Sequence, residues 1–410
     1  MICQNEFSAG SKATPLRRGT PFADDNVGIM PSSNPTPHPE VASRQYRLVI
    51  MVNMVAPYRV PVYDRIGQAF ETTVLYSNIE SNRTTWGGTL EKLKHCIARR
   101  SWGFTITLRK RGKDGVFDHR YKHITPGYFA DLVRLKPHAI LTYELGFRTM
   151  VALLYGFLYQ VPVWVWWGGT LHSSAKIRKL NAWVRRFLAR LTFRWIAYGA
   201  SSSEYIRTLG VPDSKILQIQ NCVDEQLFLD RVQPLCQPEV RPALLVVGHL
   251  VGLKGVYEML DACAAVQGRG HAFSVFFIGD GPEKENLKQK IEQLGLKNVE
   301  FLAARKPEEM PAVYQSMDML VFPTLNDVWG LVANEAILSG LPVLASKYAG
   351  CATELLEPEA IFDPLNPSEF AEALERAVLG KIPMSPPGRL KTCAQVADRI
   401  IRDVDSVLSS

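Results

Sequence analysis

Short apolar runs alternate with amphipathic segments along most of the chain. The first run, residues 46–52 (YRLVIMV), is rich in β-branched residues, which is typical of a strand buried in a parallel sheet. Helical spacing follows at about residues 60–70, and a second strand is predicted at 73–76. Because helical patterns separate most of the later apolar runs, the first half is predicted to be a doubly wound α/β domain. Its further predicted strands are residues 104–108, 139–142, 161–166, 195–198 and 216–220.

The alternation restarts after an aperiodic, proline-containing stretch at residues 228–240, which is predicted to be a linker. Beyond it, strands are predicted at 243–247, 273–278, 299–302, 319–322 and 342–345, with helices at 255–265, 283–294, 308–315 and 331–338. The fold class is therefore α/β, with two Rossmann-like doubly wound domains, 45–227 and 241–380, facing a cleft at the carboxyl ends of their strands. Residues 381–410 contain a helical pattern at 394–408 that is expected to pack back on the first domain.

Composition narrows the class of protein. Residues 1–44 carry four closely spaced prolines and no continuous apolar stretch, so a disordered leader is expected rather than a signal peptide. Seven cysteines without a C-x-x-C pair favour a reducing, cytoplasmic setting over a disulfide framework or a zinc site. No uncharged apolar run approaches the roughly 18–20 residues of a membrane span. The longest candidate, residues 150–167, contains Gln160 and Pro162 and is predicted to be a helix, a turn and a buried strand.

The stretch of residues 323–340 (PTLNDVWGLVANEAILSG) carries the clearest candidate chemistry. It leaves an apolar strand, crosses a short polar loop and enters a predicted helix. Asp327 and Glu335 lie on either side of Trp329 and Gly330. The free N–H groups and positive end of the helix are suited to a phosphate, and a carboxylate on each side can accept hydrogen bonds from sugar hydroxyls. This combination favours a nucleotide-sugar ligand.

Two other turns follow strands of the second half. Gly248 and His249 end the first of these strands, and Lys254 begins a helix, where a lysine can neutralise a diphosphate. Alone, this spacing is weak evidence for phosphate binding, because most strand-to-helix turns contain glycine and most lysines are solvated. The sequence Gly279-Asp280-Gly281-Pro282 is interpreted as a tight turn before a helix.

Together these segments resemble a known family. The series G-H-L-x-x-x-K-G, G-D-G-P and D-x-W-G-L-x-x-x-E-A-x-x-x-G-x-P-V, in this order between residues 243 and 354, is similar to the retaining GT-B glycosyltransferases of family 4. The segment Asn221-x-Val223-Asp224 resembles the N-G-V-D segment of that family. The general domain plan covers residues 45–410, and the first domain is the more divergent.

The resemblance implies roles for several residues of the second domain. Glu335 matches the ribose-binding glutamate of the E-x7-E motif, and Asp327 matches the first acid of that motif, which contacts the donor sugar. Lys254 matches the diphosphate-binding lysine. His249 stands where the family usually has arginine, and an imidazole cannot supply the fork of a guanidinium. The segment whose backbone holds the sugar and phosphates in the family is matched by Trp329, Gly330, Leu331 and Val332. The glycine after the first strand of the second domain, Gly248, is a further candidate donor-binding residue.

In the first domain the loop after the first strand, residues 53–59, lacks the glycines that the family often has. Tyr58 and Arg59 are candidate acceptor-binding residues, and a helix-start salt bridge is an equally good interpretation of Arg59. His172 follows the strand and glycine pair at residues 161–169 and resembles the active-site histidine near the donor sugar; the alternative is an ordinary loop histidine.

The resemblance also implies the reaction. No D-x-D stands out as a metal clamp, and no second carboxylate pair is evident in the first domain as a covalent nucleophile. We therefore expect a retaining reaction without a metal or other cofactor, in which Lys254, the helix N-terminus and His249 stabilise the leaving diphosphate. A metal site at Asp118, His119 and His123 is a weak alternative.

Positive charge gathers in two places, although the net charge is only +7. Residues 176–194 contain seven Lys or Arg and no acid, with apolar residues at helical spacing, and a second cluster runs from Arg99 to Lys113. Such a surface suits an anionic membrane that carries lipid-linked acceptors. The alternative is that the apolar stripe packs on the sheet and the charges are solvated. Nucleic acid is disfavoured as a partner, because no recognised binding module accompanies the charge.

The sequence therefore predicts a glycosyltransferase in the cytoplasm, or peripherally on the inner face of the membrane. Its partners would be a UDP- or GDP-sugar donor and a glycan or lipid-linked acceptor of cell-surface polysaccharide or glycolipid synthesis. Two alternatives stay open. One is another GT-B activity, such as nucleotide-sugar epimerisation, and the other is a degenerate, non-catalytic membrane-associated subunit.

Overall fold

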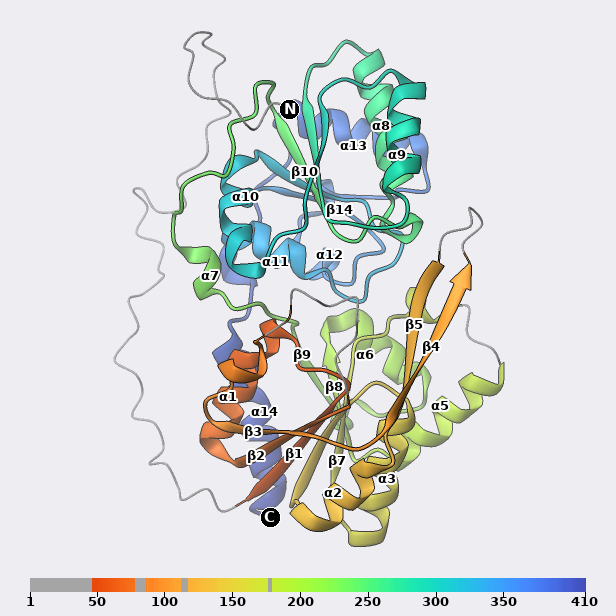
Figure 1. Ribbon diagram of the computed structural model, residues 1–410, viewed down its shortest axis with the longest axis vertical. Coiled ribbons are helices and arrows are strands. Elements are labelled where there is room, and N and C mark those ends of the chain that lie inside the picture. Colours follow the sequence, from red (N-terminus) through yellow and green to blue (C-terminus); the bar gives the residue numbers. More distant parts are fainter. Residues whose placement is uncertain (1–45, 78–85, 87, 112–116, 176–178) are drawn as a thin grey trace. The chain divides into compact units, whose positions relative to one another are not determined.

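The computed structural model describes residues 46–77, 86, 88–111, 117–175 and 179–410. Among these residues the chain forms two compact units (Figure 1). One, the N-terminal unit, contains residues 46–110, 118–224 and 391–410. The other, the C-terminal unit, contains residues 225–390. Each unit is built around its own parallel sheet, and each is described separately below.

The N-terminal unit contains a seven-stranded sheet in the order β3-β2-β1-β6-β7-β8-β9, with every neighbouring pair parallel. The strands are β1 (Arg47–Val52), β2 (Glu71–Tyr76), β3 (Cys96–Arg100), β6 (Ala139–Tyr143), β7 (Val163–Trp167), β8 (Arg194–Tyr198) and β9 (Ile216–Ile219). The helices are α1 (Val60–Ala69), α2 (Gly127–Leu135), α3 (Phe147–Tyr159), α4 (Leu171–Ser174), α5 (Lys179–Leu191), α6 (Gly199–Thr208) and α14 (Cys393–Leu408), with short 3-10 turns η1 (Pro57–Arg59), η3 (Leu90–Lys92) and η4 (Asp213–Lys215).

Alternate residues of these strands enter two different cores, as the period of a strand requires. Leu48 and Ile50 of β1 pack with helices α1 and α14 on one face of the sheet. Val49 and Met51 pack with α2, α3 and Leu188 of α5 on the other face. Figure 1 shows α14, at the blue end of the chain, beside α1. The last helix of the sequence therefore completes the core of the first unit.

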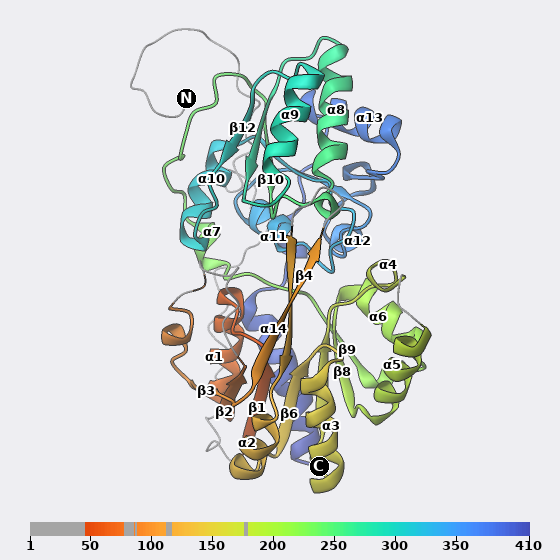
Figure 2. The ribbon, with the colours of Figure 1, turned by 45° about the vertical axis from the view of Figure 1, so that its right-hand side comes forward.

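The C-terminal unit contains a six-stranded parallel sheet in the order β12-β11-β10-β13-β14-β15. The strands are β10 (Ala243–Val247), β11 (Ser274–Ile278), β12 (Val299–Leu302), β13 (Met319–Phe322), β14 (Val343–Ser346) and β15 (Ile361–Phe362). The helices are α7 (Gln226–Leu229), α8 (Val256–Gly268), α9 (Lys284–Leu294), α10 (Met310–Ser316), α11 (Leu331–Leu338), α12 (Ala352–Leu355) and α13 (Pro367–Val378), with 3-10 turns η5 (Gly252–Lys254), η6 (Pro307–Glu309), η7 (Pro358–Ala360) and η8 (Pro387–Arg389). Figure 2 shows α8 beside both α9 and α13.

The predicted class of two doubly wound, parallel-sheet domains is confirmed, and most predicted elements differ from the observed ones by one to three residues at their ends. Strands 243–247, 299–302 and 319–322 and helix 331–338 agree at both ends. Continuous apolar runs predict these strands well because the strands are buried on both faces. All five residues of β11 and four of the five in β10 are buried.

Two strands of the N-terminal unit depart from the prediction. The strand predicted at 104–108 exists as β4 (Phe104–Arg111), but it pairs only with β5 (Phe117–Ile124) in a separate two-stranded sheet. Its Phe104 and Ile106 side chains are exposed, so its apolar residues do not mark a buried strand. The edge strand on this side of the sheet is β3, which the sequence did not reveal because its residues CIARR end in two arginines and none of them is fully buried. Among the described residues, no helix has the length and apolar character needed to cross a bilayer.

Candidate functional site in the C-terminal unit

The carboxyl ends of β10 and β13 bring the candidate residues of the C-terminal unit together. These two strands are neighbours in the sheet, and the strand order reverses between them, since β11 lies on one side of β10 and β14 on the far side of β13. In open α/β sheets, ligands bind outside the carboxyl ends of the strands at such a switch point. Gly248, His249 and Lys254 follow β10, and Asp327 follows β13. The topology therefore makes this edge the candidate ligand site of the unit.

Lys254 and Asp327 form an ion pair across the switch point. The Lys254 Nζ atom donates to Asp327 Oδ2 at 2.6 Å, and both side chains are partly exposed. The other oxygen, Oδ1, accepts from the Trp329 backbone N–H at 3.1 Å. This second bond fixes the carboxylate against the turn that starts α11. The cation and the acid that the sequence assigned to one site are thus in direct contact.

The approach of the two loops depends on a glycine. Gly255 adopts a left-handed conformation with φ +68°, and a Cβ atom there would lie 1.8 Å from the Pro323 carbonyl oxygen. Leu325 N–H also donates to the Leu253 carbonyl at 2.9 Å. Any other residue at position 255 would push the loops apart, and with them the Lys254 and Asp327 side chains.

The start of α11 supplies backbone donors beside this pair. Gly330 precedes the helix with φ +100°, and the first N–H groups of the helix, at Leu331 and Val332, have no carbonyl within the helix to bond. The Trp329 ring is buried, and its Nε1 donates to Asn334 Oδ1 at 2.9 Å. The Trp329 side chain therefore anchors the turn and is not available to a ligand.

Glu335 lies on the next turn of α11, and its environment perturbs its acidity. Burial raises the pKa of Glu335 to about 7, although a hydrogen bond from the Tyr314 hydroxyl, 2.6 Å from Oε2, works in the opposite direction. Burial and the same carboxyl group hold the pKa of Tyr314 well above its usual value. Tyr314 was not predicted from the sequence, because it lies on α10 and nothing in its local pattern points to α11.

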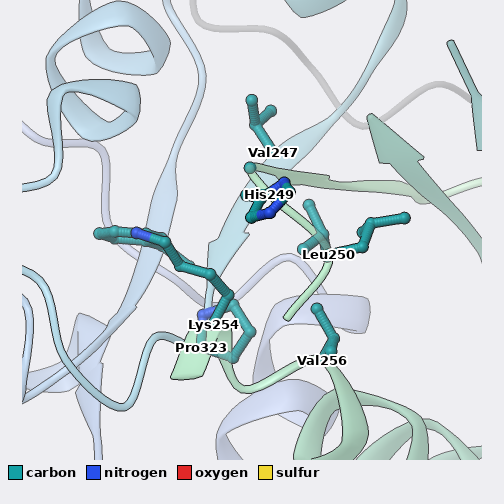
Figure 3. A pocket seen from close by; sticks show the side chains of 9 residues that line it. Val247, His249, Leu250, Lys254, Val256 and Pro323 are labelled. Carbon is teal, nitrogen blue, oxygen red and sulfur yellow. The ribbon is translucent and has the colours of Figure 1, made fainter. Parts of the chain in front are cut away.

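Gly248 and His249 line a small pocket with Lys254 and Pro323 (Figure 3). The His249 Nδ1 atom lies 2.6 Å from the Asp280 carbonyl oxygen, and a carbonyl only accepts, so Nδ1 carries the proton. This leaves Nε2 as the ring atom that can meet a ligand. Gly279 stands behind the turn with φ +142°, where a Cβ would lie 2.0 Å from the Gly248 carbonyl oxygen. The G-D-G-P turn thus has the structural role that the sequence suggested.

Candidate residues in the N-terminal unit

Arg59 is buried beneath aromatic rings at the carboxyl edge of the N-terminal sheet. Its guanidinium carbon lies 4.5 Å from the centre of the Trp166 ring and 5.0 Å from that of Tyr198. Nη2 donates to the Tyr198 hydroxyl and, at 2.6 Å, to Asn221 Oδ1. No described carboxylate forms an ion pair with Arg59, so the alternative of a helix-start salt bridge was wrong. Tyr58 is half-buried, with its ring 5.2 Å from the same guanidinium carbon.

A second buried arginine, which was not predicted, lies at the switch point of this sheet. Arg148 of α3 bonds to the Asn53 side chain after β1 and to the Tyr143 carbonyl at the end of β6. The strand order reverses between β1 and β6. Arg148 therefore ties together the two loops that flank this switch point. Its position on an apolar helix gave no local signal.

His172 lies on the single-turn helix α4 and is exposed. Thr170 caps this turn by accepting from the Ser173 backbone N–H at 3.1 Å. His172 and the donor-site residues belong to different units. Its role near a donor sugar stays a prediction. Among the described residues, no cluster of three or more potential metal ligands occurs, and the side chains of Asp118 and His119 lie outside the described part.

Part of the basic stretch at residues 176–194 forms α5 (Lys179–Leu191), and some of its apolar residues pack on the sheet, as one interpretation predicted. Binding to an anionic membrane stays a prediction. Leu188 is buried in the core shared with α3, and Val184 packs against that core. Trp183, Phe187 and Leu191 are exposed. Ile177 lies outside the described residues, as does the side chain of Leu180. In the second basic cluster, Arg99 pairs with Asp131 at 3.2 Å, and the side chains of residues 109–113 are not described.

Comparison with known proteins

Residues 233–391 match the family described as Glycosyl transferases group 1. The match covers the C-terminal unit from residue 233 onward, including Lys254, Asp327 and Glu335. A D-inositol 3-phosphate glycosyltransferase of Corynebacterium jeikeium is 36% identical over 143 residues, which are 32% of this chain and 34% of the relative. The chain spans about a third of the length of the first curated relatives it matches.

Solved structures resemble nearly the whole chain. Anabaena Alr3699/HepE, crystallised with UDP and glucose, has a TM-score of 0.62 at 18% identity, covering 89% of this chain and 99% of that one. The apo form of the lipopolysaccharide outer core galactosyltransferase WaaB has a TM-score of 0.63 at 15% identity, covering 88% and 99%. These likenesses confirm the GT-B fold class that the sequence predicted, with two Rossmann-like units.

Proposed function

We propose that the chain is a retaining glycosyltransferase that moves a sugar from a nucleoside diphosphate sugar, with UDP or GDP as carrier, to a glycan or lipid-linked acceptor. The observation that carries the proposal is the meeting of Lys254, Asp327 and the start of α11 at the switch point of the C-terminal sheet. The family match over residues 233–391 and the UDP and glucose bound by Alr3699/HepE support the same class of ligand.

Each group of this site has a role that its chemistry allows. The Glu335 carboxylate, one helical turn inside α11, accepts hydrogen bonds from the ribose hydroxyls. Lys254 and the N–H groups of Leu331 and Val332 face the diphosphate, where positive charge is needed. The Asp327 carboxylate accepts from hydroxyls of the donor sugar. Gly248 leaves open space in front of its backbone, which lets the diphosphate lie close.

The proposed reaction breaks the bond between the anomeric carbon and the diphosphate oxygen, and the electron pair stays on that oxygen. Lys254 and the positive end of α11 stabilise the charge that develops there. The acceptor hydroxyl attacks the anomeric carbon from the face that the diphosphate leaves, and its proton passes to a phosphate oxygen. Because cationic and dipolar groups of the chain face the leaving group, the proposal requires no divalent metal or other cofactor.

The remaining predicted residues take supporting roles in the proposal. His249 meets the diphosphate through Nε2. His172 lies near the donor sugar, and Tyr58 and Arg59 belong to the acceptor side. The similarity to a lipopolysaccharide galactosyltransferase supports an acceptor from cell-surface polysaccharide or glycolipid synthesis. The proposal places the enzyme in the cytoplasm or peripherally on the inner face of the membrane.

The proposal is tested first by ligand binding. The melting temperature is measured with UDP, GDP and their sugar conjugates, because a ligand that binds the native state raises it. One nucleotide should raise the melting temperature of the wild type, and Glu335→Ala should abolish that shift. A wild type that responds to none of these ligands contradicts the proposal and favours a non-catalytic relative.

Turnover of the preferred donor then tests the reaction. Release of the nucleotide should continue in excess EDTA, and the product should keep the anomeric configuration of the donor, as read by NMR coupling constants. A strict requirement for a divalent metal, or an inverted product, contradicts the mechanism. Conversion of the donor into an epimer with no acceptor present would favour the epimerase alternative.

A further inference from the structure

The outer face of α3 is apolar although it is exposed. Met150, Leu154, Phe157 and Leu158 lie on one stripe of this helix, at a spacing of four, three and one residues. Phe157 is 71% exposed and Leu154 is 52% exposed. The helix contains no acid, and its one cation, Arg148, is buried against Asn53. A helix that covers a sheet normally carries charged residues on its outer face, so α3 lacks the surface expected of it.

Helix α5 exposes aromatic and basic residues on one side. Trp183, Phe187 and Leu191 are spaced by four residues, and the first two rings stack with their centres 5.9 Å apart. Arg186 and Arg190, which lie between these residues in the sequence, are also exposed. Helix α5 contains no Asp or Glu. Bulky apolar side chains interleaved with arginine are typical of helices that lie in a membrane interface.

The two helices belong to one layer. Leu188 of α5 shares a core cluster with Ala152 and Leu153 of α3. That cluster also contains Val163 of β7, and the next residue of the strand, Trp164, belongs to the core on the opposite face. Because α3 and α5 cover the same face of the sheet, their outer faces both point away from it. Helix α2, which packs against α3, adds exposed Arg134 and Lys136 to this layer.

We propose that the outer faces of α3 and α5, termed here the α3–α5 surface, bind an anionic lipid bilayer. The apolar side chains enter the headgroup region while Arg186 and Arg190 pair with lipid phosphates. Monomeric soluble proteins rarely expose apolar patches of this extent without a partner. Charge decides between a bilayer and a second copy of this chain, because a symmetric contact would set these arginines against a surface with no acid on either helix.

The inference depends on the proposed function in one point: if the acceptor is lipid-linked, binding of the α3–α5 surface brings the enzyme to the bilayer that contains the acceptor. The structure adds one element to the membrane-binding surface that the sequence suggested. The basic stretch pointed to α5 alone, whereas the larger apolar contribution comes from α3, which carries no exposed charge and no basic motif.

Vesicle flotation tests the surface. The full chain is mixed with vesicles of equal parts phosphatidylglycerol and phosphatidylcholine, or of phosphatidylcholine alone, and the floating fraction is measured. The wild type should float with the anionic vesicles. Leu154→Ser with Phe157→Ser should lower the partition coefficient by about tenfold or more, because two apolar side chains no longer enter the bilayer. Arg186→Gln with Arg190→Gln should lower it by about tenfold, since each basic residue near an anionic surface adds attraction.

Matched controls separate the surface from general effects. Leu365→Ser with Leu379→Ser removes two exposed apolar residues of the C-terminal unit. Arg399→Gln with Arg402→Gln removes two exposed charges of α14, on the opposite face of the N-terminal sheet. Both control pairs should float like the wild type. The four replaced residues of the α3–α5 surface are exposed, and circular dichroism melts should show folded variants.

Three results would overturn the proposal: no flotation of the wild type, equal flotation with neutral vesicles, or flotation that the α3 and α5 variants leave unchanged. A wild type that is dimeric by sedimentation, with the dimer lost in Leu154→Ser and Phe157→Ser, would assign the surface to self-association instead. Thermal shifts with UDP and GDP are read on the same samples. Flotation without nucleotide binding contradicts the proposed function alone, and nucleotide binding without flotation contradicts this surface alone.

Discussion

Lys254 and Asp327 lie in the segments that follow β10 and β13 of the C-terminal sheet, and their side chains meet with Nζ 2.6 Å from Oδ2. Their exposed fractions are 30% and 19%, so solvent screens the pair and its contribution to stability is about 0–1 kcal/mol. The ion pair matters mainly for ligand binding at the candidate site. In the proposed reaction Lys254 must face a diphosphate, so a bound nucleotide has to compete with Asp327 for the same ammonium group.

Substitution of either partner should therefore change nucleotide affinity in opposite directions. Asp327→Asn removes the competing charge and should raise UDP or GDP affinity severalfold, while turnover falls because the sugar contact is lost. Lys254→Ala should weaken nucleotide binding and lower kcat by about 10²–10³-fold, the usual effect of removing a group that stabilises a developing anion. Calorimetric titration and initial rates measure the two quantities.

The matched control is a second ion pair of the same unit. Lys290 Nζ of α9 lies 2.7 Å from Asp261 Oδ1 of α8, on two helices rather than on the loops after β10 and β13. Lys290→Ala should leave both nucleotide affinity and kcat at wild-type values. If Asp327→Asn loses nucleotide affinity as strongly as Lys254→Ala, Asp327 does not compete with the diphosphate, and the interpretation is wrong.

Glu335 should make stability depend on pH. Its pKa is raised from 4.5 to about 7, so the folded state prefers the neutral acid. The resulting stabilisation is fully present below about pH 4.5 and is lost as the pH rises through about 7, up to roughly 3 kcal/mol in all. Glu335→Gln cannot ionise. The melting temperature of the wild type should therefore fall relative to that of Glu335→Gln between about pH 5 and pH 8.

Exposed Glu285 provides the control for this titration. Glu285→Gln should follow the wild type across the same pH range. A constant difference between the wild type and Glu335→Gln at every pH would show that the carboxyl group is already ionised in the folded state.

The same ionisation should control nucleotide affinity. The ionised Glu335 carboxylate accepts hydrogen bonds from the ribose hydroxyls more strongly than the neutral acid does, so the affinity for the preferred nucleotide should rise as the pH passes through about 7. Because the phosphates also titrate, the quantity to follow is the ratio of wild-type to Glu335→Gln affinity. This ratio should increase with pH in calorimetric titrations. A ratio that stays flat or falls would exclude the proposed ribose contact.

His249 should stabilise the leaving diphosphate less well than an arginine would. The Nδ1 atom is held by the Asp280 carbonyl, so only Nε2 can meet a phosphate, whereas a guanidinium offers a charged fork of donors. His249→Arg should therefore raise kcat by about tenfold, and His249→Gln should lower it, as measured by initial rates. Equal rates for all three proteins would remove His249 from the reaction.

The meeting of Lys254 and Asp327 at one edge of the C-terminal sheet was predictable because the signals in the sequence are local. A short strand, a glycine turn and a charged residue at its end recur at β10 and β13, and parallel strands bring such ends together. The same reasoning could not reach Tyr314 or Arg148. Each acts on residues of another element, Glu335 and Asn53, and no spacing within its own helix reports that contact.

For the fold, too, local sequence patterns were sufficient in some segments and insufficient in others. Buried strands such as β10 and β13 were predicted to the residue, because parallel strands covered on both faces are continuously apolar. The edge strand β3 was missed because only one neighbour and partial burial constrain its residues. The apolar character of α3 was visible in residues 150–167, but a sequence pattern does not say which apolar face of a helix is left uncovered.

Gly255→Ala should test how closely the two site loops must approach. An alanine Cβ would lie 1.8 Å from the Pro323 carbonyl oxygen, and φ +68° is itself unfavourable for alanine. The strain should cost about 1–3 kcal/mol or more and should lower both the melting temperature and the nucleotide affinity, because Lys254 and Asp327 would move apart. Gly252→Ala, in the same turn, meets nothing within 4 Å and is the matched control. Loss of stability in both variants alike would mean that the whole turn, rather than the contact between Gly255 and Pro323, sets the geometry of the site.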